Sequence, residues 1–290
     1  MEQIVHPRPQ FQDHIVSQDL VSLYPFPHDI TIDHKSNAAT FAHEIYKQGA
    51  IPRCLVLWVD GSAASPAHDK LCSAAIGYHD PQSSEWREYV TISLLNSGSS
   101  NEAELMAIQE GLRQACTLTD YFDRLLLFSD CQSMLQAIKN QSMFIFLREK
   151  HIVNDIFEHA NAIYNLGIQT KLHWVPADAH IEGHMRVDKV SREYRRLATG
   201  LWPKDLLKCD AALEPITIIP GSLASAREDL RVILRDHLGQ VKEAKSSNKY
   251  SRQLHEVIEQ RRKKRLKRRI RKAKQDNEIR EELVRALTRN

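Results

Sequence analysis

The chain has 290 residues, enough to bury one sizeable core of about 150 residues with additional segments, or to form two small domains. Its 42% apolar and 27% charged residues are ordinary for a soluble globular protein. The longest apolar run, residues 54–59, is far shorter than the roughly 18 residues of a membrane span, which argues against any segment within a bilayer.

The cysteines and the N-terminus both favour an intracellular protein. The five cysteines are odd in number and show no CxxC pair, which predicts reduced thiols and neither a disulfide framework nor a zinc site. His6, Arg8 and Asp13 stand where a secretory signal would need an apolar block, so we expect no export.

Positive charge is concentrated near the C-terminus. Residues 261–274 (Arg261 to Lys274), called the basic block below, contain 11 of the 40 lysines and arginines and no acidic residue. The remainder is acidic, although the net charge of the whole chain is +3. Such a block predicts contact with nucleic acid, an acidic partner or a nuclear import receptor, and it is equally typical of a solvated helix.

Changes in composition predict four segments. Residues 1–53 form an extension that contains prolines, histidines and one short helix, and residues 54–200 form a strand-rich domain. Residues 201–223, with three prolines and a glycine, are predicted to be a linker. Residues 224–290 show helical patterning and form a basic extension.

The domain opens on a strand that ends in a carboxylate. Residues 55–59 form an apolar run suited to a strand buried on both faces, and Asp60 and Gly61 follow it. Residues 72–79 and 86–95 predict two more strands, which together with the first could form an antiparallel meander.

The second part of the domain alternates helices with strands. Ser99 and Glu102 form the capping-box signature of a helix that carries Glu104 in its opening turns. Residues 124–130 repeat the pattern of a buried strand that ends in a carboxylate, Asp130. Helices at 131–139 and 148–166, a strand at 169–176 and a helix from Glu182 follow. This order predicts an α/β fold with a mixed sheet flanked by helices.

Four acidic residues occupy comparable places in these elements. Asp60 and Asp130 lie at strand ends, while Glu104 and Asp188 lie near the N-terminal ends of helices. They converge only if the first and fourth strands of the sheet are neighbours. Carboxylates gathered so closely would repel one another unless they were protonated or bridged by cations, so convergence predicts Mg²⁺ or Mn²⁺.

The motifs around these acids resemble a known family. The stretches LWVDGS (57–62), NEAELMA (101–107), FSDCQ (128–132) and 174–188 look like the four blocks of type 1 ribonuclease H. In their residues and spacing they most resemble the RNase H domains attached to retrotransposon reverse transcriptases. The resemblance implies an RNase H-like fold with a five-stranded mixed sheet, in which three strands are antiparallel and two are parallel.

The resemblance also implies roles for individual residues. Asp60, Glu104, Asp130 and Asp188 take the positions of the catalytic carboxylates that bind two Mg²⁺ or Mn²⁺ ions. Asn101 and Gln132 take positions that contact the minor groove of an RNA/DNA hybrid, where 2′-hydroxyls distinguish RNA. The implied activity is metal-dependent hydrolysis of the RNA strand of such hybrids.

The sequence departs from the family in one loop. Asp178 stands where the family usually has a histidine that assists proton transfer or product release. His180 follows two residues later, and His184 stands where the family often has asparagine. Either histidine could serve instead, and His180 is the catalytic candidate. Because Asp178 replaces the usual histidine, we expect a weaker enzyme.

Two other functions stay open. The domain could have lost turnover and act as a nucleic-acid-binding protein, or the C-terminal helices could serve a nuclear scaffold. Residues 54–200 hold 13 basic and 18 acidic residues, so phosphate contacts would have to come from elsewhere, such as the basic block. Because a basic cluster also suits nuclear import, we expect a nuclear location over a cytoplasmic one.

Overall fold

The computed structural model describes residues 25–64, 71–94, 99–141, 149–201, 216–219 and 227–235. The chain divides into two compact units, Met1–Arg227 and Glu228–Asn290. In the second unit the described residues, 228–235, are helical, within the helix predicted for 224–238. The basic block lies outside the described residues. None of the helices that the structure describes has the length and apolar character needed to cross a membrane.

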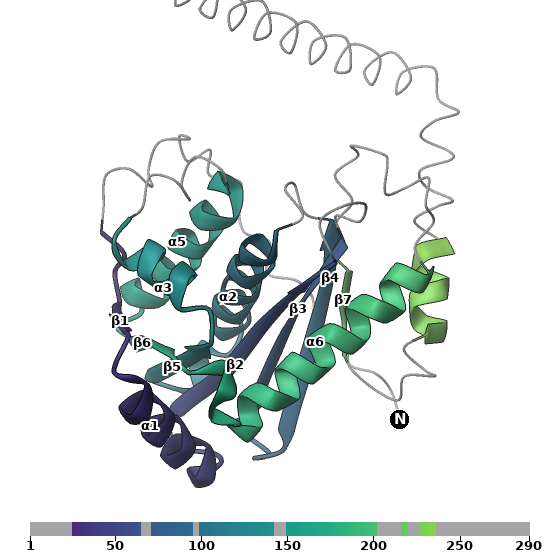
Figure 1. The fold of residues 1–290 in the computed structure, drawn as a ribbon. Coiled ribbons are helices and arrows are strands. Elements are labelled where there is room, and N and C mark those ends of the chain that lie inside the picture. The colour runs from purple at the N-terminus through teal and green to yellow at the C-terminus, as the bar shows by residue number, and fades with distance from the viewer. Residues whose placement is uncertain are drawn as a thin grey trace, which may run out of the picture. The chain divides into compact units, whose positions relative to one another are not determined.

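The first unit is built on a mixed sheet of the predicted α/β class (Figure 1). The strand order is β1-β6-β5-β2-β3-β4-β7. Strands β1, β6, β5 and β2 pair in parallel, and β2, β3, β4 and β7 pair antiparallel. The bounds are Asp29–Thr31 (β1), Cys54–Ala63 (β2), Leu71–His79 (β3), Trp86–Leu94 (β4), Arg124–Ser129 (β5), Gln169–Trp174 (β6) and Ile216–Ile218 (β7).

The five predicted strands are confirmed, and the sheet contains two more. The additional strands β1 and β7 have three residues each and add to the outer edges of β6 and β4. A three-residue strand is too short to show an alternating pattern, which explains why neither was predicted. Strand β7 falls within residues 201–223, the stretch predicted as a linker.

Helices cover both faces of the sheet (Figure 1). Helices α2 and α5 pack together behind the central strands, and α6 crosses β2, β3 and β4 on the opposite face. The bounds are Lys35–Gln48 (α1), Ser100–Cys116 (α2), Gln132–Lys139 (α3), Lys150–Asn165 (α5) and Glu182–Leu201 (α6). Two 3-10 turns, η2 (Thr119–Tyr121) and η3 (Ala177–Ala179), lie in the connections.

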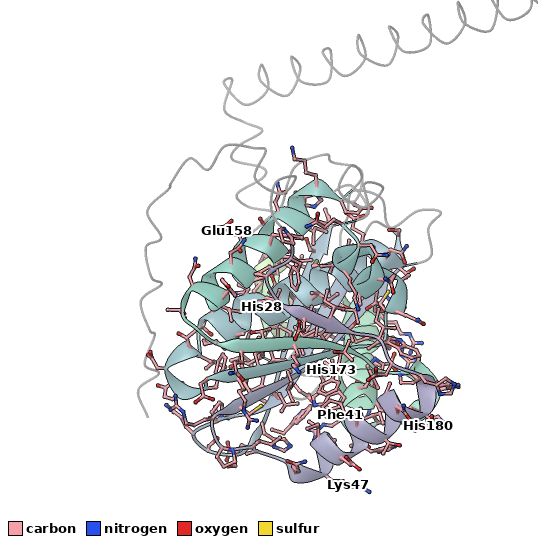
Figure 2. All side chains as sticks on the ribbon, turned by 90° about the vertical axis from the view of Figure 1, so that its left-hand side faces the viewer. His28, Phe41, Lys47, Glu158, His173 and His180 are labelled. Carbon is pink, nitrogen blue, oxygen red and sulfur yellow. The ribbon has the colours of Figure 1, made fainter. Side chains whose placement is uncertain are left out.

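A row of rings crosses three parallel strands on the α6 face. Trp58 of β2, Phe128 of β5 and His173 of β6 are directly paired in register. Their ring centroids lie 4.4 Å and 5.3 Å apart. Phe41 of α1 covers the row at 4.8 Å from the His173 ring (Figure 2). The N-terminal extension therefore contributes to the core below the strand ends that carry Asp60.

His173 makes the stability of the fold depend on pH. Burial, together with the charge on Lys171, lowers the pKa of His173 to about 4. In the unfolded chain the His173 ring binds a proton at about pH 6.5, whereas the folded protein binds it only near pH 4. The contribution of the neutral ring to the free energy of unfolding is therefore fully present above pH 6.5 and is lost as the pH falls towards 4. When the pH is lowered from 7.5 to 4.5, the free energy of unfolding should fall by about 2 to 3 kcal/mol less in His173→Phe than in the parent, as measured by urea unfolding.

A matched control for this experiment is His180→Asn. His180 is exposed, so this variant removes a histidine without changing the packing around the row of rings. If His173→Phe follows the parent at every pH, the proton is not lost from His173 on folding.

Candidate active site

The position of Asp60 follows from a close approach between β2 and α2. The prediction that the strand ends at Asp60 is wrong, because β2 continues to Ala63 and stays paired with β3; the Asp60 side chain is buried and 5% exposed. The next residue, Gly61, lies so near α2 that an added Cβ would be 2.3 Å from the carbonyl carbon of Ala103. Only glycine therefore allows β2 to pass the first turn of α2, which brings Glu104 beside Asp60.

Glu104 projects from the start of α2. Ser99 caps this helix by accepting a hydrogen bond from the Glu102 N–H at 3.2 Å, as the sequence predicted. The Glu104 Oε2 accepts a hydrogen bond from the Gly61 N–H at 3.2 Å. Burial and the negative charges of Asp60 and Asp130 raise the pKa of Glu104 well above its usual value. The acids of β2 and α2 therefore share one electrostatic environment.

Asp130 reaches the same place because β5 is the parallel neighbour of β2. It directly follows β5 and lies two residues past Phe128, while Asp60 lies two residues past Trp58, the partner of Phe128 in β2, so the two acids are level with each other. The Trp174 Nε1–H donates a hydrogen bond of 3.0 Å to the Asp130 carbonyl oxygen and holds this turn in place. The adjacency that the four-acid prediction required is thus present.

Helix α6 supplies three further side chains from one of its faces. His184, Asp188 and Ser191 follow one another at steps of four and three residues, which places them on the same side of the helix. The Ser191 hydroxyl donates a hydrogen bond to Asp60 Oδ2. Asp188 is half-buried and pairs with Arg192, one turn further along α6.

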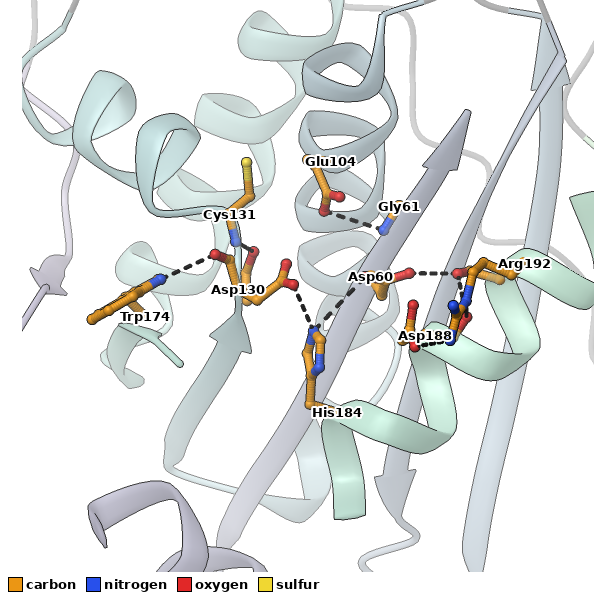
Figure 3. A network of polar contacts seen from close by, with 11 residues as sticks. Asp60, Gly61, Glu104, Asp130, Cys131, Trp174, His184, Asp188 and Arg192 are labelled. Atoms are coloured by element: carbon orange, nitrogen blue, oxygen red, sulfur yellow. Dashed lines mark hydrogen bonds and ion pairs between the residues drawn. The ribbon is translucent and has the colours of Figure 1, made fainter. Parts of the chain in front are cut away.

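His184 makes the closest contacts with the acids (Figure 3). Its Nε2 lies 3.4 Å from Asp130 Oδ2 and 3.8 Å from Asp60 Oδ1, and the residue is 5% exposed. Burial acts to lower the pKa of His184, but the contact with Asp130 and the charges of Asp130 and Asp60 outweigh it and raise that pKa. One ligand atom from each of the three residues lies within 4.8 Å of the others.

The residues present fit a divalent cation. Burial, reinforced by the charges of Asp130 and Asp188, raises the pKa of Asp60 to about 7, although Ser191 and His184 act against it. The Nε2 of His184 is buried and makes no hydrogen bond. Crowded carboxylates and an unbonded imidazole nitrogen are the groups that a bound metal ion would satisfy. Asp60, Asp130 and His184 form the tightest set, with Glu104 and Asp188 beside it.

The two predicted substrate contacts lie on the surface near these acids. Gln132 is exposed at the first turn of α3 and lines an open hollow of about 500 Å³ together with Asp130 and Cys131. Asn101 is exposed in the first turn of α2.

A comparison with known families decides the relationship of this chain. The family model described as RNase H matches residues 52–196, half of the chain. The chain belongs to the RNase H family. The resemblance seen in the four sequence blocks is therefore confirmed at the level of the family.

Solved RNase H structures resemble this RNase H domain at low sequence identity. The RNase H1 of the halophilic archaeon Halobacterium salinarum is 16% identical, with 48% of this chain and 96% of that chain covered and a TM-score of 0.33. The N-terminal RNase H domain of a Mycobacterium tuberculosis protein is 13% identical, with 51% and 96% covered and a TM-score of 0.35. No curated protein matches the chain by sequence.

The loop that departs from the RNase H pattern contacts the N-terminal extension. Asp178, in η3, forms an ion pair with Lys35 of α1. Their side chains are 65% and 59% exposed, so this pair contributes little to stability. His180 follows at the end of η3 with a left-handed backbone (φ 52°) and is exposed. The structure thus brings His184, and not His180, against Asp60 and Asp130.

The importance of His184 in this RNase H domain was not predicted from the sequence alone. The sequence offered His184, together with His180, as a possible substitute for the missing loop histidine, but it predicted no contact of His184 with Asp60 or Asp130. Its step of four residues to Asp188 on a helix was the available signal, because residues at this spacing share a face. Burial and the direction of the ring could not be read from that spacing.

Proposed function

We propose that the chain is a metal-dependent endonuclease that hydrolyses the RNA strand of RNA/DNA hybrids with two divalent ions. The observation that supports this proposal is that Asp60 and Asp130 lie within ligand reach of one another, and that the charges of Glu104 and Asp188 belong to the same electrostatic cluster. Burial and the neighbouring acidic charges raise the pKa values of Asp60, which is buried, and of Glu104, which is half-buried. A bound cation would remove this electrostatic cost.

The side chains have distinct tasks in this proposal. Asp60 and Asp130 bind metal, Ser191 holds one oxygen of Asp60 so that the other faces the ion, and Glu104 and Asp188 complete the acidic shell. Bound ions would activate the attacking water and stabilise the leaving oxygen. Asn101 and Gln132 contact the minor groove and sense the 2′-hydroxyl.

The experiment that tests this function uses an end-labelled RNA/DNA hybrid. With Mg²⁺ or Mn²⁺ the protein should cut only the RNA strand and leave 3′-hydroxyl and 5′-phosphate ends, while EDTA should stop the reaction. RNA/RNA and DNA/DNA duplexes of the same sequence are the controls and should stay intact. Binding of the hybrid without cleavage would favour the nucleic-acid-binding function instead.

His180 remains the proposed proton-transfer residue, because His184 faces the carboxylates. His180→Asn should lower kcat by about tenfold and leave KM unchanged, since the metals still generate the nucleophile. Asparagine tolerates the left-handed backbone at this position, so the loop should keep its shape. Steady-state kinetics on the hybrid measures both values, and an unchanged kcat rejects the role.

A companion variant restores the residue that the family usually has in this loop. Asp178→His should raise kcat above that of the parent if the missing histidine limits turnover. The change also breaks the ion pair with Lys35, so Lys35→Ala is the matched control and should leave kcat unchanged.

We also propose a role for the basic block. The basic block would supply the phosphate contacts that the acidic domain lacks, and it would favour a nuclear location. Its charge supports both proposals. Removal of residues 261–290 should then weaken hybrid binding and flatten its salt dependence. The residues and spacing of the four motif blocks support an origin close to the RNase H domains of retrotransposon reverse transcriptases.

A further inference from the structure

The first turn of α6 is fixed against the row of rings. An added Cβ on Gly183 would lie 2.5 Å from the Trp58 ring, so the helix backbone rests directly on that ring. Trp58 is in turn stacked on Phe128. Asp60 and Asp130 each follow one of these aromatic residues by two positions. His184, next to Gly183, is therefore held over the two carboxylates by backbone packing.

The imidazole is placed as a ligand would be. Two ligands of one ion lie about 3 to 3.5 Å apart when each metal bond is about 2.0–2.2 Å long. The Nε2 of His184 is 3.4 Å from Asp130 Oδ2, which is within this range, and 3.8 Å from Asp60 Oδ1, which is slightly beyond it. Nε2 makes no hydrogen bond, and Asp60 keeps Oδ1 available because its Oδ2 accepts from Ser191.

The neighbouring acids have other partners in this arrangement. Glu104 accepts from the Gly61 N–H, and Asp188 pairs with Arg192. Among the described residues, the set of ligand atoms that lie close together is one nitrogen and two oxygens, from α6, β2 and the residue that follows β5. A carboxylate-only site suits Mg²⁺, whereas an imidazole ligand favours first-row transition ions.

We propose that His184 is a direct nitrogen ligand of a divalent ion held with Asp60 and Asp130, and that it makes this site select Mn²⁺ over Mg²⁺. The inference deepens the proposed function, on which it rests, by specifying the ion and one of its ligands. It also excludes His184 from proton transfer, because a coordinated Nε2 carries no proton.

Mn²⁺ bound to the full-length protein is the probe. Pulsed electron paramagnetic resonance should detect a nitrogen nucleus coupled to Mn²⁺. Labelling all histidines with ¹⁵N should convert the ¹⁴N pattern to the ¹⁵N pattern. This readout needs neither substrate nor turnover. Mn²⁺ that binds without nitrogen coupling overturns the inference, and so does a failure to bind Mn²⁺.

His184→Asn assigns the nitrogen and measures its effect on selectivity. Asparagine, which the family often has here, should abolish the coupling and lower the ratio of Mn²⁺ to Mg²⁺ affinity by about tenfold, measured by competition with Mg²⁺. His180→Asn is the matched control and should keep both properties. An unchanged ratio in His184→Asn overturns the inference, and thermal unfolding checks that both variants are folded.

The hybrid assay separates this inference from the proposed function. Nitrogen coupling in a protein that cuts no hybrid supports the ligand and rejects the nuclease. Cleavage of hybrids by a protein without nitrogen coupling supports the nuclease and rejects the ligand.

Discussion

Asp60→Asn should abolish hybrid cleavage and at the same time stabilise the metal-free protein. The amide keeps the shape of the carboxylate but lacks the charge that binds metal, so the rate should fall at least about 10³-fold, equivalent to about 4 kcal/mol. A general loss of structure would lower both activity and stability. A loss of cleavage together with a gain in stability would therefore identify Asp60 as a residue that is needed for activity at a cost in stability.

The stability change should depend on pH in a defined direction. The pKa of Asp60 is raised from its usual value to about 7, so the folded protein keeps a proton that the unfolded chain loses near pH 4. The contribution of Asp60 to stability is therefore greatest in acid and falls as the pH rises to about 7. Asp60→Asn should exceed the parent by about 1–4 kcal/mol at pH 8 and should match it near pH 4.

Urea unfolding in EDTA measures this difference. Asp123→Asn is the control, because Asp123 is an exposed partner of Arg53 and should change neither cleavage nor the pH profile. If Asp60→Asn is no more stable than the parent at pH 8, the carboxylates are not crowded as described.

Gly61→Ala should cost about 3 kcal/mol or more, because a methyl group has no space there. The new Cβ would lie 2.3 Å from the Ala103 carbonyl carbon and 2.5 Å from the Glu104 nitrogen, and both are backbone atoms that cannot turn aside. Strand β2 and helix α2 would have to separate. Glu104 would then move away from Asp60, so cleavage should fall together with stability.

A second glycine provides the matched control. Gly200, near the end of α6, has no atom within 4 Å of an added Cβ. Gly200→Ala should be neutral or stabilising by up to about 1 kcal/mol, because alanine is the better helix former. Urea unfolding of both variants measures the contrast, and equal stability would show that β2 and α2 are not in close contact.

The sequence was most informative where local pattern and tertiary role coincide. The apolar runs before Asp60 and Asp130 predicted buried strands, and the parallel pairing of β2 with β5 brings those acids to one edge. Ser99 predicted the start of α2, and the cap is present. These features could be predicted because strand length, burial and capping are written in consecutive residues.

Other features depend on contacts that no local pattern encodes. Residues 36–48 were predicted as a short helix, and no contact with the domain was predicted for it, yet Phe41 covers the ring of His173 and Lys35 pairs with Asp178. His184 and His180 are equally plausible in sequence and are separated only by the direction of the chain at the start of α6. Tertiary packing determines both the contacts of α1 and which histidine faces the acids.

The edge strands define how short a working fragment can be. Residues 29–31 and 216–218 pair with β6 and β4 and lie outside residues 52–196, the part that the family model matches. A recombinant fragment trimmed to 52–196 would leave two sheet edges unpaired and would uncover the rings beneath Phe41, which favours self-association. Crystallisation and activity trials should therefore keep the flanking sequence on both sides.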